Sequence, residues 1–165
     1  MAQQIASLVE KEGGRVYYVG GFVRDRILNS RGKDVDVEVH GITEEKLIEI
    51  LDSLGTRIEK GSSFGVFGLA HYDLYIAMPR TERKTGRGHT DFHVTVEPFM
   101  GTYKAARRRD FTINAMMQDV LTGEIIDHFG GMADLAGSNK DAPGVIRHVN
   151  DSTFTEDPLR VLRAA

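Results

Sequence analysis

The 165-residue sequence contains no cysteine. Disulfide bonds and thiolate metal sites are therefore excluded, and a reducing, cytoplasmic location is expected. The sequence also lacks an apolar run long enough to span a membrane and a signal-peptide pattern at its N-terminus, so no membrane partner is expected. Its net charge of −3 argues against a general nucleic-acid coat but permits local basic surfaces. What remains is a globular chain long enough for one sizeable core.

The hydrophobic pattern predicts a mixture of helices and short strands. Residues 81–91 are polar and contain glycine, which predicts a mobile loop, and residues 111–120 fit a helix or a strand equally well. The chain stops inside an apparent helix, so we expect a longer natural protein or a partner surface on another chain. Helices are expected at residues 2–12, 22–28 and 43–54, just before Arg107, from 130–131 and from 157–158, and strands at 15–19, 34–39, 65–70, 72–78 and 125–127.

Two aspartates, Asp34 and Asp36, stand on the expected strand 34–39. Side chains on a strand alternate between its faces, so the two carboxylates share a face, with Cα atoms roughly 6.5 Å apart. Carboxylates at this separation can converge on a pair of Mg²⁺ ions about 3.5–4 Å apart. Taken alone, such a pair is more often a solvated strand edge.

A glycine pair, Gly20 and Gly21, follows the apolar strand 15–19 and opens a helix that carries Arg24. Backbone N–H groups at such a turn can meet phosphate oxygens without a Cβ in the way. A simple turn is the plainer alternative. The turn, the arginine-bearing helix and the acidic strand follow one another closely, however, and together they suggest a phosphate cradle beside a carboxylate metal site, which is the chemistry of nucleotidyl transfer.

Basic side chains gather at two further places in the sequence. For either group alone, a solvated face is the favoured interpretation. The six histidines show no metal-ligand spacing and are assigned no chemistry. The basic groups are Arg80, Arg83, Lys84 and Arg87, and Lys104, Arg107, Arg108 and Arg109.

Several segments share their order and spacing with one enzyme family. Besides the glycine turn and the acidic pair, they are residues 80–86 (RTERKTG), 108–115 (RRDFTINA) and 156–164 (EDPLRVLRA). From Val16 onward the chain resembles the class II tRNA nucleotidyltransferases, the CCA-adding enzymes, with bacterial poly(A) polymerases as close relatives. The resemblance implies an α+β head domain of the DNA polymerase beta-like nucleotidyltransferase fold, a small mixed sheet flanked by helices, at residues 1–150. Residues 151–165 would begin a helical neck.

The resemblance also implies a reaction and a site. The 3′-hydroxyl of a tRNA would attack the α-phosphorus of CTP or ATP, and pyrophosphate would leave. Asp34 and Asp36 would be the catalytic residues and hold two Mg²⁺ ions, with Mn²⁺ as an alternative. Asp25 would orient Arg24 or stand as a helix-start residue rather than act as a ligand, and Asp110 would hold the neighbouring arginines in place. The nucleotide would be bound by Gly20, Gly21, Arg24, Arg109, Asn114, Asp157, Arg160 and Arg163.

The sequence departs from the family pattern at one position. Tyr75 stands where family members usually have an acidic residue, and Asp73, on the same face of a regular strand, could substitute. The family's base-reading motif is missing, since residues 156–163 correspond to an earlier motif of the head. A flexible loop at 81–91 favours CCA or A addition. The alternatives are a poly(A) polymerase-type adenylyltransferase, a non-catalytic nucleotide- or RNA-binding head, and a subunit whose neck, body and tail come from missing C-terminal sequence or a second chain.

Overall fold

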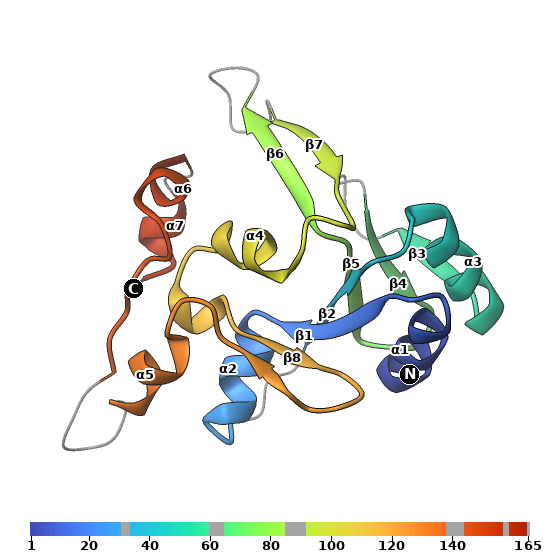
Figure 1. Cartoon of the computed structure of the whole chain (residues 1–165), viewed down its shortest axis with the longest axis horizontal. Helices are drawn as coiled ribbons and strands as arrows, with labels where there is room; N and C mark the ends of the chain where they lie inside the picture. The colour runs from blue at the N-terminus through green and yellow to red at the C-terminus, as the bar shows by residue number, and fades with distance from the viewer. Residues whose placement is uncertain (31–33, 60–64, 85–91, 138–143, 157–158, 165) are drawn as a thin grey trace. The chain divides into compact units, whose positions relative to one another are not determined.

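The computed structural model describes residues 1–30, 34–59, 65–84, 92–137, 144–156 and 159–164 (Figure 1). The chain divides into two compact units. The first contains Met1–Tyr17 and Lys33–Gly101, and the second contains Tyr18–Gly32 and Thr102–Ala165. Within the described ranges, no helix combines the length and the apolarity that crossing a bilayer requires.

The first unit is built on a mixed sheet with the strand order β3-β4-β5-β2-β1. Strands β2 and β5 run parallel, whereas β3 pairs with β4 and β4 with β5 in antiparallel fashion. A separate antiparallel ribbon is formed by β6 and β7 (Figure 1). The elements are α1 (Ala2–Lys11), β1 (Arg15–Val19, which continues into the second unit), β2 (Val35–His40), α3 (Glu44–Leu54), β3 (Arg57–Glu59), β4 (Val66–Leu69), β5 (Leu74–Ala77), β6 (Arg80–Lys84) and β7 (Phe92–Val96).

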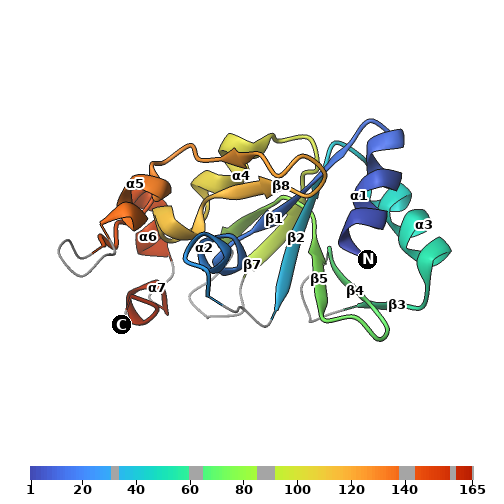
Figure 2. The same cartoon turned by 90° about the horizontal axis from the view of Figure 1, so that it is seen from below.

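Helices α1 and α3 form because their apolar residues recur at helical spacing and are buried. The two helices lie side by side (Figure 2). Helix α3 begins as predicted, with the hydroxyl of Thr43 accepting a hydrogen bond from the backbone N–H of Lys46 at 3.3 Å. The buried residues are Ile5, Ala6 and Val9 on α1, and Leu47, Ile50 and Leu51 on α3.

The second unit consists of short helices and one small hairpin of β8 and β9. Its core is the buried cluster of Val23, Met116 and Leu135, which brings together three distant segments of the chain. The elements are α2 (Gly21–Ile27), α4 (Thr102–Arg107), the 3-10 helix η1 (Thr112–Asn114), β8 (Met117–Asp119), β9 (Ile125–Ile126), α5 (Gly131–Ala136), α6 (Asp151–Glu156) and α7 (Leu159–Leu162).

The α+β class is confirmed, but parts of the element prediction are wrong. Residues 81–84 belong to strand β6 rather than to a loop, and residues 85–91 lie outside the described part of the chain. Two strands can pair through their backbones without an apolar face. The polar sequence of β6 therefore lacks the alternation of apolar and polar residues by which a strand is predicted. Residues 111–120 turn out to be η1 followed by β8. Strand β3 and helix α6 were missed because both are short and polar.

One glycine of the second unit sits where a side chain does not fit. A Cβ on Gly131 would lie 2.4 Å from the carbonyl oxygen of Thr112 and 2.9 Å from the Met116 side chain. The first neighbour is backbone and cannot rotate away. We therefore expect Gly131→Ala to lower the free energy of unfolding by about 1–3 kcal/mol, as overpacking typically does.

Urea unfolding followed by circular dichroism would measure this loss of stability. Gly55→Ala is the matched control, because a Cβ built on Gly55 meets nothing within 4 Å. Equal stability of the two variants would contradict the close packing of α5 on η1.

Candidate functional site

The acidic pair belongs to the first unit. Asp34 is exposed just before β2, and Asp36 is half-buried as the second residue of that strand. The parallel register of β2 and β5 makes Asp36 and Tyr75 direct partners. Because strand side chains alternate, Asp34, Asp36 and Tyr75 lie on one face of the sheet.

The same face of β2 continues into a buried polar pair. Glu38 and His40 are both less than a tenth exposed, and Oε1 of Glu38 lies 2.8 Å from Nε2 of His40. The ring of Tyr17 packs edge-on against His40 at 5.2 Å between centroids. Glu38 is therefore engaged inside the fold, whereas Asp34, just before the strand, is exposed and Asp36 is half-buried.

The residues of this face fit a hard divalent cation in their chemistry, because carboxylate oxygens are the ligands such ions prefer. No cluster of three or more acidic, histidine or cysteine side chains with metal-binding geometry occurs among the described residues. The protein ligands of a cation at this face would thus be the two carboxylates of Asp34 and Asp36. Tyr75, which is 39% exposed, places a phenol at the position where family members usually have an acidic residue. Asp73 is exposed and precedes β5, and its suggested role as a substitute stays a prediction.

A hydrogen-bonded network in the second unit joins two of the predicted nucleotide-binding residues, Arg24 and Asn114, to the carboxylates of Asp25 and Asp110. Arg24, on α2, donates from Nε to Oδ1 of Asp25 at 2.9 Å and from NH1 to Oδ1 of Asn114 at 2.8 Å. Asn114 in turn donates from Nδ2 to Oδ1 of Asp110 at 3.2 Å. Asp25 orients Arg24, as the sequence suggested. The fork of Arg24 is thus held at both ends before any ligand arrives, which preorganises it for an anion.

The glycine turn lies directly against the guanidinium groups of Arg24 and Arg109. A Cβ built on Gly20 would come within 3.3 Å of NH1 of Arg109, and one on Gly21 within 3.3 Å of NH2 of Arg24. Gly20 also has a positive φ of 69°, which favours glycine. The turn therefore gives Arg24 and Arg109 room beside a side-chain-free backbone, which is the environment that phosphate oxygens can approach.

Asp110 connects this network to the C-terminal helices. It is 5% exposed, and its Oδ1 caps the backbone N–H of Phe111 at 2.8 Å. NH2 of Arg163 lies 3.0 Å from Oδ2 of Asp110, an ion pair by distance although not a well-directed hydrogen bond. Arg160 donates from NH2 to the carbonyl oxygen of Arg108 at 3.1 Å.

The predicted site residues therefore fall into two groups. The acidic pair lies in the first unit, while the glycine turn and the arginines lie in the second. Asp157 lies outside the described residues. The tie between Asp110 and Arg163 was missed, because no local pattern links residues so far apart in sequence. The predicted nucleotide-binding residues that the second unit brings together are Gly20, Gly21, Arg24, Arg109, Asn114 and Arg163.

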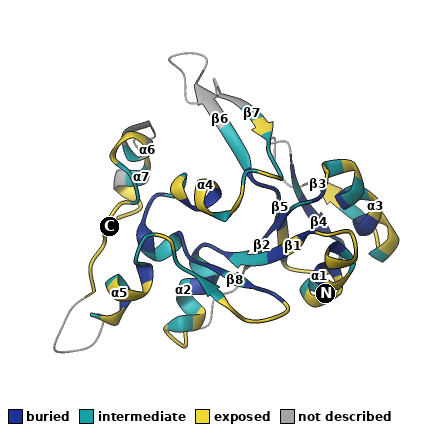
Figure 3. Cartoon of the chain, viewed as in Figure 1, coloured by how far each residue is buried: buried dark blue, intermediate teal, exposed yellow. Residues whose placement is uncertain are grey.

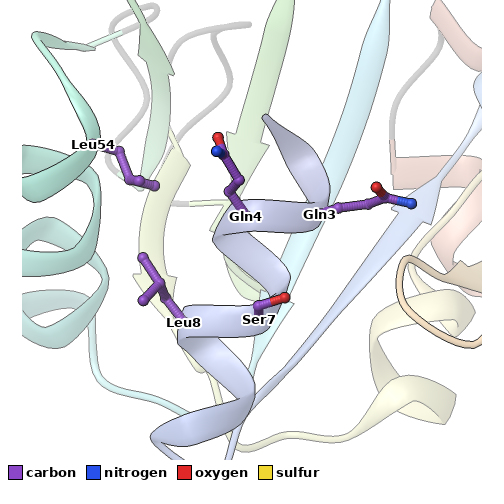
Figure 4. Close-up of a pocket in the computed structure, with 5 residues that line it drawn as sticks. All are labelled: Gln3, Gln4, Ser7, Leu8 and Leu54. Carbon is purple, nitrogen blue, oxygen red and sulfur yellow. The ribbon is translucent and has the colours of Figure 1, made fainter.

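The first unit also has a pocket that is separate from these residues. Figure 4 shows it beside α1, with Gln3, Gln4, Ser7, Leu8 and Leu54 around a volume of about 380 Å³. Its lining contains no charged group, so it offers nothing that would recognise phosphate or a cation.

The sequence is similar to the poly A polymerase head domain and to multifunctional CCA proteins. The family model described as the poly A polymerase head domain matches residues 16–139. Multifunctional CCA proteins of Haemophilus ducreyi and Aromatoleum aromaticum are 42% and 44% identical over 151 residues, covering 92% of this chain and 34% of each relative. The chain thus spans about a third of the length of the curated relatives it matches.

The structure is also similar to solved structures of CCA-adding enzymes. The Bacillus stearothermophilus CCA-adding enzyme in complex with CTP superposes with a TM-score of 0.75 at 29% identity, over 98% of this chain and 37% of that one. The Thermotoga maritima CCA-adding enzyme complexed with tRNA gives a TM-score of 0.70 at 31% identity, over 97% of this chain and 34% of that one.

Proposed function

The chain belongs to the poly(A) polymerase head-domain family, and from that membership we propose that it is the catalytic head of a tRNA nucleotidyltransferase. It would add C and A from CTP and ATP to the 3′ end of tRNA without a template. The observation that carries this proposal is the Arg24 fork, held by Asp25 and Asn114 beside the side-chain-free turn at Gly20 and Gly21. The names of the relatives, CCA proteins and CCA-adding enzymes, support the same substrates.

In the proposed reaction the tRNA 3′-hydroxyl oxygen forms a bond to the α-phosphorus, and the bond from that phosphorus to the bridging oxygen breaks to release pyrophosphate. Arg24 and Arg109 would bind the phosphates, since both guanidinium groups lie against the glycine turn. Asn114 would fix the orientation of Arg24 or contact the ribose. Arg160, Arg163 and Asp157 would close the nucleotide pocket from the C-terminal helices.

Asp34 and Asp36 would hold the divalent cations, with Mg²⁺ as the expected ion and Mn²⁺ as an alternative. When bound, such ions lower the pKa of an attacking hydroxyl and offset charge on the triphosphate and leaving group. Asp36 lies in β2, where the parallel pairing with β5 holds the backbone, and Asp34 immediately precedes that strand.

The proposed domain organisation follows the family resemblance. Residues 1–150 would form the head, and residues 151–165, which contain α6 and α7, would begin the helical neck. A neck, body and tail, from the same polypeptide or a second chain, would hold the tRNA. We place the activity in the cytoplasm, where tRNA and nucleoside triphosphates meet, and the cysteine-free sequence is compatible with that compartment.

Incorporation of radiolabelled CTP and ATP into a tRNA that ends at the discriminator base tests this proposal. We expect two cytidines and one adenosine, resolved as discrete bands, and no product after chelation of divalent ions. Long A tails on any RNA would instead favour the poly(A) polymerase alternative. Nucleotide binding without any incorporation would favour the non-catalytic head, an outcome for which Tyr75 in place of an acid is the motivating feature.

A further inference from the structure

An exposed cluster of rings stands on the second unit, formed by Tyr103, His128 and Phe129 and called here the α4 ring cluster. Tyr103 is 54% exposed although its ring stacks on Phe129, with centroids 5.3 Å apart and planes 28° apart. The ring of His128 meets Tyr103 edge-on at 5.4 Å. The tyrosine is therefore supported by its neighbours while much of its surface faces solvent, on a helix with an exposed side (Figure 3).

The segment beneath Tyr103 is held in place by hydrogen bonds. The hydroxyl of Thr102, at the start of α4, lies 2.9 Å from Nε2 of His128. Asp127 accepts hydrogen bonds from the backbone N–H groups of Gly131 and Met132, at 2.8 and 2.9 Å, one on each carboxylate oxygen. The rings are thus fixed before binding, which lowers the entropic cost of stacking a ligand on them.

Two exposed basic side chains stand on the same helix as Tyr103. Lys104 and Arg107 are exposed on α4, whose sequence contains no acidic residue. Arg107 lies four residues after Tyr103 and so on the same side of the helix. The nearby carboxylate of Asp127 is already occupied by its two backbone donors. A supported aromatic face with adjacent cations matches single-stranded nucleic acid, whose bases stack and whose phosphates are negative.

We propose that the α4 ring cluster, with Lys104 and Arg107, is a binding site for single-stranded RNA. A base stacks on Tyr103, and Lys104 and Arg107 contact the flanking phosphates. The inference rests on the proposed function, which supplies an RNA substrate, and adds an RNA contact made by residues other than those of the nucleotide network. It also gives Arg107 a role different from that of Arg109.

Binding of a short fluorescein-labelled single-stranded RNA, followed by anisotropy without nucleotide or divalent cation, tests the site. Tyr103→Leu is expected to weaken the affinity about 5- to 100-fold, and Tyr103→Phe to leave it within about twofold, because any aromatic ring can stack on a base. The matched control is Tyr72→Leu, since Tyr72 is a similarly exposed tyrosine of the first unit, at 46%. Lys104→Gln and Arg107→Gln should each reduce the slope of log affinity against log salt concentration by about 0.7.

The site would be overturned if Tyr103→Leu bound RNA as tightly as Tyr72→Leu. A change in the mass seen by light scattering, with that RNA affinity kept, would assign the rings to a protein contact instead. Failure of the proposed function looks different, because RNA binding would still depend on Tyr103 while the wild-type chain incorporated no nucleotide.

Discussion

Replacing Asp36 by asparagine is expected to reduce nucleotide incorporation about 100- to 1,000-fold, and Asp34→Asn should act similarly. Asparagine keeps the size of the side chain and leaves the backbone pairing of β2 with β5 intact. It removes one of the two negative charges proposed to hold the cations. Ions in such sites contribute several kcal/mol to transition-state stabilisation, and about 1.4 kcal/mol corresponds to a tenfold change in rate. Single-turnover incorporation of labelled CTP would measure the effect.

The control for this prediction is Asp52→Asn. Asp52 lies on α3 in the same unit, half-exposed and paired with Arg57 at 2.9 Å, so its loss should change stability and activity little. Thermal unfolding of all three variants separates lost chemistry from lost fold. If both strand variants incorporated CTP at the wild-type rate, the acidic pair would have no catalytic role.

The parts of the fold that were predicted correctly are those encoded by local periodicity. The buried positions of α1 recur at helical spacing, and Thr43 signals the start of α3 with a side chain that caps it. The acidic strand was found because its charged and β-branched residues alternate. In each case a window of about ten residues contains the whole signal.

The predictions that failed involve elements whose partners lie elsewhere in the chain. The strand β6 contains four charged residues and a threonine, and it pairs with β7 from Arg80 opposite Val96 to Lys84 opposite Phe92. The sequence of such a ribbon lacks the alternation of apolar and polar residues that predicts a strand. Likewise, Arg24 and Asn114 were both assigned to the nucleotide, yet nothing in the sequence tells that they bind each other across 90 positions.

The hydrogen bond between Arg24 and Asn114 makes the site residues depend on one another. Arg24, Asn114 and Asp110 form a chain of hydrogen bonds, so a substitution at one of them alters the orientation of the next. Asp110, buried at the end of that chain, takes Arg163 as a further partner. The family resemblance assigned Arg24 and Asn114 to the nucleotide and Asp110 to holding the arginines, whereas the structure shows that Asn114 joins Arg24 and Asp110 in one hydrogen-bonded chain.

Arg24→Gln is therefore expected to weaken the binding of CTP and ATP about 10- to 100-fold. The variant loses the permanent charge that we propose binds phosphate, and hydrogen bonds to a charged group are worth about 1.5–3 kcal/mol. Arg24→Lys should recover only part of the affinity, because an ammonium group cannot bridge Asp25 and Asn114 as the guanidinium fork does. Equilibrium dialysis with labelled nucleotide would give the dissociation constants.

Arg26→Gln is the matched control, one helical turn away from the glycine pair but on an exposed side of α2. Its guanidinium lies over the rings of Tyr18 and Phe22, at 5.3 and 5.6 Å, so its loss should leave nucleotide affinity near the wild-type value.

A double-mutant cycle that combines Arg24→Gln with Asn114→Ala adds a sharper test. If Asn114 acts by orienting Arg24, the double variant should bind nucleotide no more weakly than Arg24→Gln alone. Fully additive losses would mean that Asn114 contacts the nucleotide independently, and unchanged binding in Arg24→Gln would remove the arginine fork from the site.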